Sequence, residues 1–417
     1  MKFWTGIALI ACALPAVVLP ATAQNLPTPP GLPPTPAARQ WIDQDPTVVQ
    51  ARSALLATGH AAAMLNTGTH EWTTRVALQR RNYQTGGPDS KEWNAQLERG
   101  IRVNGKAELD RQIGETELAI AQARVGEAIH EAAKSLLDLW IDGLAASQAQ
   151  EMFSQQQTSA QANLRAVDSR KRAGDASALD LGVAAADAAD VERQASQAAS
   201  NLVKARAKLR VRFPEAKLPN LPLGDPLPPV EAEAQWLARV LEAADPLRIA
   251  EGQVRRAELN ASRASADRVP DPTIGVFAAS ESFRQERIMG ITISIPLSGT
   301  YRSERAQQAL QEAETARAAV DRERRELENS VAETYADATG NVARWRLAEQ
   351  GAAAASENAR LTQRAYALGE ADLQSLLLAR RQFLEASRAA LDARADALRA
   401  NYRLLIDSHL IWDLAVD

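Results

Sequence analysis

Residues 366–377 read YALGEADLQSLL and residues 172–181 read RAGDASALDL, and these two similar segments decide the fold. Each places a glycine turn inside a long stretch whose apolar residues recur at helical spacing. No proline lies between Asp89 and Phe213 or after Pro296. Because an interior proline costs about 3 kcal/mol in a helix, each turn is predicted to join two long antiparallel helices.

The stretches before the two turns are nearly equal in length, from Gly105 to about Arg170 and from Thr300 to about Tyr366. At 1.5 Å per residue, each would span roughly 100 Å. Ala, Gln and charged residues separate the larger apolar ones, which indicates coiled-coil-like packing rather than one large globular core. Helical hairpins are therefore predicted over residues 105–212 and 300–412.

The hairpins belong to two copies of a larger pattern. Asp45-Pro46 and Asp245-Pro246 each open a shorter helix, since Asp caps a helix and Pro suits its first turn. Two stretches of β character follow in each copy, and they predict strands at 71–83, 91–103, 273–282 and 288–297. The chain thus divides into a first repeat over 37–213, a Pro-rich linker over 214–230 and a second repeat over 231–417.

The predicted strands alternate between apolar and polar residues over about ten positions, as membrane β-strands do. A water-soluble sheet with one wet face gives the same alternation. Arg75, Arg81 and Arg102 fall on the polar side, where they would line a lumen or simply meet solvent. Four strands cannot close a barrel, and lipid forbids open edges. A membrane role would therefore require several copies of the chain.

The first residues have the pattern of a secretory signal peptide over residues 1–23. Lys2 precedes an apolar run, and Ala21-Thr22-Ala23 forms a small-residue cleavage site. Residues 24–36 are Pro-rich and predict an extended tether. The text before Cys12 loosely resembles a lipoprotein cleavage site, so lipidation of Cys12 stays open. No later segment approaches the length of an apolar membrane-spanning helix.

Composition argues against several functions. The 48 Lys and Arg against 52 Asp and Glu leave a net charge of -4, which does not favour nucleic acid. The one Cys lies in the predicted leader, so a Cys-based zinc site is excluded. His60, His130 and His409 are scattered along the sequence. No phosphate loop and no nucleophile–base pairing is recognisable. We therefore predict no enzyme, no cofactor and no dedicated metal site.

The doubled layout, together with YALGEADLQSLL, closely resembles the TolC-type outer-membrane efflux family over about residues 37–414. The other tip matches less fully, because it lacks the tyrosine. ISIPL at 293–297 resembles the end of a strand in the family's second repeat. The resemblance implies a mainly α fold with a transmembrane β part. It also implies a homotrimer in which three chains form a twelve-stranded barrel in the outer membrane of a Gram-negative bacterium, and a long α-helical barrel across the periplasm.

The family's proteins are exit ducts of tripartite pumps or of type I secretion. The resemblance therefore implies outer-membrane lipid, a periplasmic adaptor and an inner-membrane pump, expected to be of the RND type, as partners. The compact length and LERGIRVNGK at 97–106 look somewhat like the heavy-metal-efflux branch, whose cargo is metal cations. Two other classes compete. A periplasmic adaptor should have a single hairpin, and a structural coiled coil leaves the strands unexplained.

The two tips carry the residues expected to dock the adaptor and form the gate. They are Gly174, Asp175, Asp180, Leu181, Tyr366, Gly369, Glu370, Asp372 and Leu376. The glycines permit a left-handed turn. The acids would form a cation-favouring ring if they faced inward in a trimer. Helix capping explains acids at these positions equally well, and capping is the preferred interpretation for Asp372.

Overall fold

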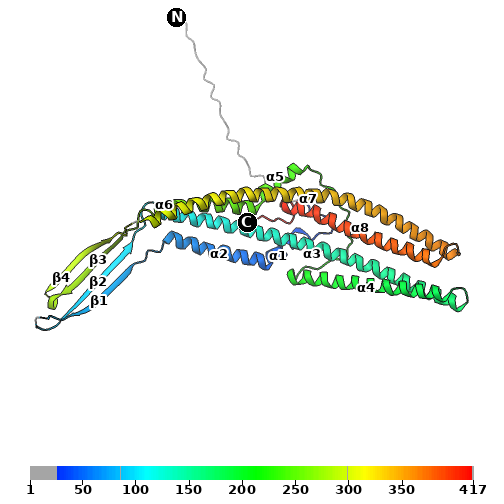
Figure 1. Cartoon of the computed structure of the whole chain (residues 1–417), viewed down its shortest axis with the longest axis horizontal. Coiled ribbons are helices and arrows are strands. Elements are labelled where there is room, and N and C mark those ends of the chain that lie inside the picture. Colours follow the sequence, from blue (N-terminus) through cyan, green and yellow to red (C-terminus); the bar gives the residue numbers. More distant parts are fainter. Residues whose placement is uncertain (1–25, 85, 298, 416–417) are drawn as a thin grey trace, which may run out of the picture.

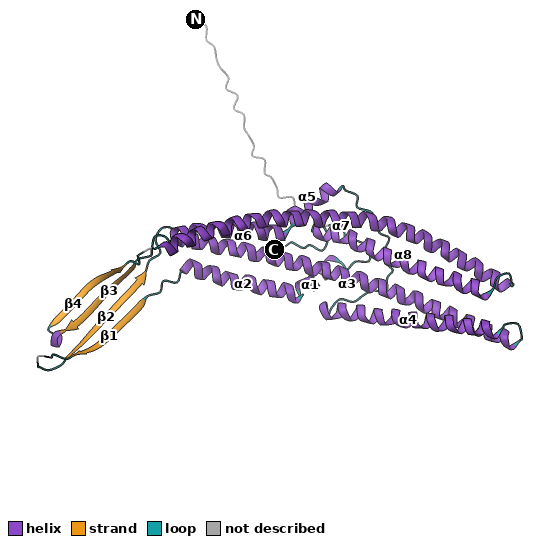
Figure 2. Cartoon of the chain, viewed as in Figure 1, coloured by secondary structure: helices purple, strands orange, loops and turns teal. Residues whose placement is uncertain are grey.

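The computed structural model describes residues 26–84, 86–297 and 299–415, so the predicted signal peptide and Cys12 lie outside the described residues. The molecule is elongated, with a helical body that carries a sheet at one end (Figures 1 and 2). The helices are α1 (Thr35–Asp43), α2 (Pro46–Thr67), α3 (Lys106–Arg172), α4 (Ala178–Arg212), α5 (Glu233–Ala243), α6 (Asp245–Ala266), α7 (Thr300–Leu368) and α8 (Leu373–Asp407). The strands are β1 (Thr73–Arg81), β2 (Ser90–Gly100), β3 (Thr273–Glu281) and β4 (Glu286–Ser294).

Two helical hairpins run the length of the body. Helices α3 and α7 have 67 and 69 residues, which at 1.5 Å per residue is roughly 100 Å each. Each packs against the helix that follows it, α4 or α8, while α2 and α6 lie along their other halves. Both hairpin turns lie at the end opposite the sheet (Figure 1).

Several boundaries differ from those predicted. The short helices α1 and α5 were not distinguished from the helices that follow them, and α1 begins at Thr35, inside the predicted tether. The second hairpin ends at Asp407 rather than at residue 412. His409 adopts a φ of 53°, which stops the helix, and the chain then turns so that Trp412 is fully buried. The linker at 214–230 contains no helix or strand.

The core is thickest in the middle of the body. Leu136, Leu137 and Ile141 of α3 are fully or nearly fully buried there. The indole N–H of Trp140 donates to the Gly31 carbonyl at 2.7 Å, and that of Trp412 donates to the Pro33 carbonyl at 3.1 Å. The segment before α1 is thereby fixed to α3, and the segment after α8 is fixed to the segment before α1.

The strands form one antiparallel sheet in the order β1-β2-β3-β4. Strands β2 and β3 come from different repeats and pair with Trp93 opposite Ser280 and Gly100 opposite Thr273. The two repeats are therefore joined through the middle of the sheet. Within the described chain, β1 and β4 each have a strand neighbour on one side only. None of the described helices is both long and apolar enough to cross a membrane.

A buried lysine connects the sheet to the helices. Lys106, at the start of α3, is 1% exposed, and its ammonium donates to the Val269 carbonyl and to Asp271 Oδ1, both at 2.7 Å. The Val103 backbone N–H donates to the same Asp271 oxygen at 3.0 Å. The first repeat supplies Lys106 and the second supplies its acceptors, so this contact fixes both repeats where the strands begin.

We predict that Lys106→Met will destabilise the protein by about 3 kcal/mol, because it leaves a largely buried carboxylate without its cation. Thermal unfolding of the purified protein, followed by circular dichroism, would show a lower apparent Tm. Lys204→Met is the matched control, because Lys204 is exposed on α4. If Lys106→Met and Lys204→Met had the same melting temperature, Lys106 would not have this stabilising role.

The contact between Lys106 and Asp271 also predicts that the stability of the folded protein falls at low pH. Burial opposes ionisation of Asp271, but hydrogen bonds from Lys106 and Val103 outweigh it and hold the pKa of Asp271 below its usual value. A lowered folded-state pKa contributes stability that is complete above the unfolded-state pKa and is lost as the pH falls through the folded one. Wild type should therefore lose more stability than Asp271→Asn below about pH 4, as measured by melting temperature against pH. If the melting temperatures of wild type and Asp271→Asn fell in parallel with pH, this prediction would be wrong.

Candidate functional site

The two faces of the sheet differ in polarity. On one face, ion pairs and hydrogen bonds connect the strands. Arg75 lies 3.5 Å from Glu98, and Arg81 lies 3.1 Å from Glu92 and 3.0 Å from Glu281. Arg75 and Arg81 therefore lie where the alternation predicts them, on a polar face that runs across the sheet.

The opposite face is apolar and uncovered within the chain. Leu78 is 82% exposed and Met289 is 85% exposed. The register places further exposed apolar side chains beside them, namely Val76, Trp93, Leu97, Ile274, Val276, Ile291 and Ile293. An uncovered apolar surface of this kind marks an interaction with lipid or with another protein.

Arg102 does not belong to either face, contrary to the expectation that it lines a lumen. Strand β2 ends at Gly100, so Arg102 lies in the junction. Its guanidinium donates to the Leu65 and Asn66 carbonyls at 2.8 and 2.6 Å and to Asp110 at 2.9 Å. These acceptors lie at the end of α2 and the start of α3. Arg102 therefore anchors the junction.

The glycines at both tips adopt the left-handed conformation. Gly174 has a φ of 83° and Gly369 a φ of 79°. After Gly174, Ser177 and Asp180 form a capping box at the start of α4. After Gly369, Asp372 accepts a hydrogen bond from the Ser375 backbone N–H at 2.7 Å. These hydrogen bonds lower the pKa values of Asp180 and Asp372. Asp372 therefore caps α8, and Asp180 completes the capping box whose N-cap is Ser177.

Side chains from both tips meet. The Arg170 guanidinium donates to Asp175 at 2.9 Å and to the Tyr366 hydroxyl at 3.2 Å, and it stacks over the Tyr366 ring at 5.5 Å. Below this contact, Leu376 is fully buried in an apolar cluster that Leu181 also touches. We expected both leucines to dock a partner, but Leu376 instead packs the hairpins together. Glu370 is exposed.

A polar cluster in the middle of the body was missed in the sequence. His130 of α3 lies 3.0 Å from Asp407 at the end of α8, and its ring is 5.6 Å from that of His409. Burial raises the pKa of Glu127, whereas burial and the neighbouring His130 lower the pKa of His409 to about 4. The cluster was not recognisable in the sequence, because His130 and its partner Asp407 are 277 positions apart.

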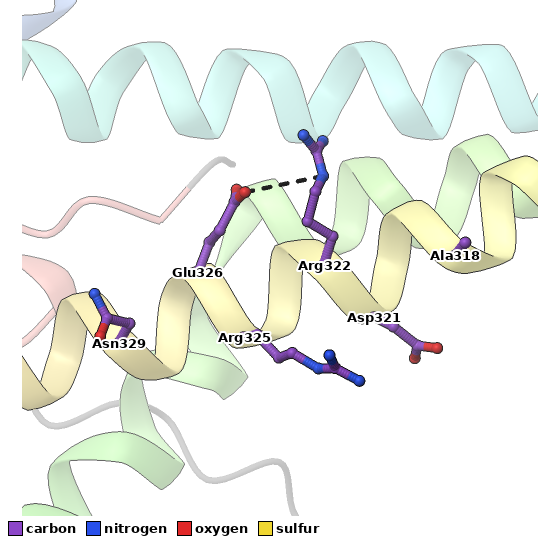
Figure 3. A pocket seen from close by; sticks show the side chains of 6 residues that line it. All are labelled: Ala318, Asp321, Arg322, Arg325, Glu326 and Asn329. Carbon is purple, nitrogen blue, oxygen red and sulfur yellow. Dashed lines mark ion pairs between the residues drawn. The ribbon is translucent and has the colours of Figure 1, made fainter.

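A hollow on α7 is not a binding site. Figure 3 shows its lining residues, Ala318, Asp321, Arg322, Arg325, Glu326 and Asn329. All of them belong to α7, and Arg322 pairs with Glu326 at 3.9 Å. Because the six side chains are exposed along one helix, they do not converge on a ligand.

The comparisons with known proteins agree with this geometry. Residues 236–405 match the model of the outer membrane efflux protein family. The matched part of the chain, within the second repeat, is therefore similar to the outer membrane efflux protein family. Members of that family are transport ducts rather than enzymes. None of the curated proteins matches the sequence.

Solved structures of membrane proteins, two of them named as outer-membrane proteins, share the fold over almost the whole chain. A membrane protein from Pseudomonas aeruginosa is 14% identical, with a TM-score of 0.77 over 92% of this chain and 91% of that one. The outer membrane protein VceC of Vibrio cholerae is 16% identical, with a TM-score of 0.73 over 90% and 95%. The MtrE outer membrane channel of Neisseria gonorrhoeae is 19% identical, with a TM-score of 0.64 over 92% and 90%.

The left-handed turn at the second tip predicts opposite effects for two substitutions of the same kind. Gly369→Ala should destabilise the protein by about 1–2 kcal/mol, because a Cβ disfavours the left-handed conformation. Gly351→Ala, inside α7 with open space around its Cα, should instead stabilise it by about 0.5–1 kcal/mol. Melting temperatures of the two variants would test this prediction. If both substitutions raised or both lowered the melting temperature, the prediction would be wrong.

Proposed function

We propose that this chain is the outer-membrane exit duct of a tripartite efflux system and works as a homotrimer. The observation that carries the proposal is a sheet with one bare apolar face and one ion-paired polar face at the end of roughly 100 Å helices. Three such sheets would close a twelve-stranded barrel with the apolar face toward lipid. Closure would also pair the open edges of β1 and β4, which lipid does not tolerate.

Strand length and aromatic placement support this orientation. The strands have 9, 11, 9 and 9 residues, and a tilted membrane strand needs about 9–11. Trp72 precedes β1 near the helices, with the Arg99 guanidinium 5.6 Å over its ring. Tyr83 and Phe283 stack with their ring centroids 6.0 Å apart at the far end. Aromatic residues at both ends of an apolar band are typical of the two membrane interfaces.

The helical tips would face a periplasmic adaptor, which joins the duct to an inner-membrane pump of the RND type. We propose metal cations as cargo, on the resemblance of residues 97–106 to the heavy-metal branch. The side chains left to meet an adaptor are those that the apolar cluster does not bury, among them Glu370 and Asp175.

We further propose that the contact between Arg170 and Tyr366 holds the tip closed. Arg170→Ala would remove both its hydrogen bonds and its stacking on the ring, and conductance in planar bilayers should rise severalfold. Arg172→Ala is the matched control, because Arg172 pairs only within α3, with Asp168 at 3.3 Å. Discrete channels with identical conductance in both variants would refute the gate but leave the duct standing. Absence of channels from folded wild-type protein would refute the duct.

An acidic ring at the tips can be tested without breaking the caps. Asparagine caps a helix about as well as aspartate, so Asp175→Asn with Asp372→Asn removes charge and keeps the turns. If these acids face the lumen of a trimer, cation selectivity in the bilayer should fall. Unchanged selectivity would leave Asp372 as a helix cap and Asp175 as the acceptor of Arg170, with no ring.

A further inference from the structure

Three potential metal ligands lie together on one face of α3, in the middle of the body. They are Glu127, His130 and Glu131, and one donor atom from each lies within 4.8 Å of the others. Spacings of three and four residues place side chains on the same face of a helix. One imidazole and two carboxylates are a donor set suited to a divalent transition cation.

The end of α8 orients the imidazole of this group. His130 Nε2 lies 3.0 Å from Asp407 Oδ1, and Lys134 Nζ lies 3.3 Å from the same oxygen. A hydrogen bond from Nε2 to the Asp407 carboxylate leaves the lone pair of a neutral imidazole on Nδ1. Nδ1 lies 4.0 Å from Glu127 Oε2. A carboxylate that holds the far nitrogen of a histidine is the usual support of a metal-bound imidazole.

The carboxylate facing that lone pair lacks a partner. Glu127 Oε2 is buried and accepts no hydrogen bond from any described residue. Leaving a buried acceptor unsatisfied is unfavourable, and two acceptors face each other here with nothing to donate between them. A cation between Nδ1 and Oε2 would satisfy both. The side chain of Glu127 must turn slightly toward the ring, because ligands about 2.0–2.2 Å from one zinc ion lie closer together than 4.0 Å.

The surroundings carry an excess of negative charge. The carboxyl groups are Glu127, Glu131, Asp245 and Asp407, whereas the fixed cations are Lys134 and Arg248. A hollow of about 500 Å³, lined in part by Asp245, Arg248 and His409, opens beside the cluster. An ion and its water ligands could therefore reach the site from the surface.

We propose that Glu127, His130 and Glu131 bind one divalent transition cation, of the Zn²⁺ type, in each chain. Asp407 is a positioning residue for His130, and water or His409 supplies the remaining ligand. With His409 as that ligand, the ion would also connect α3 with the segment after α8. The site uses contacts within one chain only, so it stands apart from the duct proposal and from the identity of the cargo.

The test is titration calorimetry with ZnCl₂ on full-length, tag-free protein in detergent, after removal of metal with a chelator. Wild type should bind one Zn²⁺ per chain, and its melting temperature should rise with Zn²⁺. Glu127→Gln and His130→Gln should abolish this binding. Asp407→Asn should retain the site but weaken it by about 10–100-fold. His60→Gln, at an exposed position on α2, should bind as wild type does.

Two results would overturn the proposal. One is wild-type protein that binds no stoichiometric Zn²⁺. The other is unaltered binding in both Glu127→Gln and His130→Gln. Glu127→Gln preserves side-chain shape, and its far-ultraviolet circular dichroism should match that of wild type, so lost binding in this variant is not lost folding. Co²⁺ provides a second readout, because its visible absorption should change in His130→Gln and not in His60→Gln.

Discussion

The position of the sheet on the helices depends on one buried ammonium group. Lys106 is removed from water, and the carbonyl and carboxylate that compensate it come from the other repeat. Leaving such a charge unpaired in the interior would cost several kcal/mol, so the two repeats cannot separate at this point without a large penalty. Strands β2 and β3 leave from the same place. The pairing of the two strands ends at Gly100 and Thr273, a few residues from this contact in each repeat.

Local signals made the hairpins and strands predictable. Glycine in a turn, the absence of proline and the alternation of polarity all act over a few neighbouring residues. They located the turns at Gly174 and Gly369 and the polar face of the sheet that carries Arg75 and Arg81. They failed for Arg102 and Leu376, because both depend on what the chain brings together from elsewhere. Arg102 meets the end of α2, and Leu376 meets the other hairpin.

The cluster around His130 could not be predicted from neighbouring residues either. Nothing near His130 in the sequence indicates that Asp407 and His409 lie against it, because these residues come from the end of α8 and the segment after it. The left-handed turn at His409 could not be predicted either, since glycine or asparagine is usual at that position. Polar clusters built from distant segments become visible only when helix packing is known.

The sheet end of the molecule and the helical tips lie far apart, so a small rotation at the sheet end becomes a large displacement at the tips. The sheet and the Lys106 contact hold both repeats at one end, and each long helix extends from there without interruption to its tip (Figure 1). Over roughly 100 Å of rigid helix, a rotation of one degree at the fixed end displaces the tip by about 2 Å. Such a displacement exceeds the tolerance of a hydrogen bond. A distortion too small to disturb the sheet is thus large enough to separate Arg170 from Tyr366.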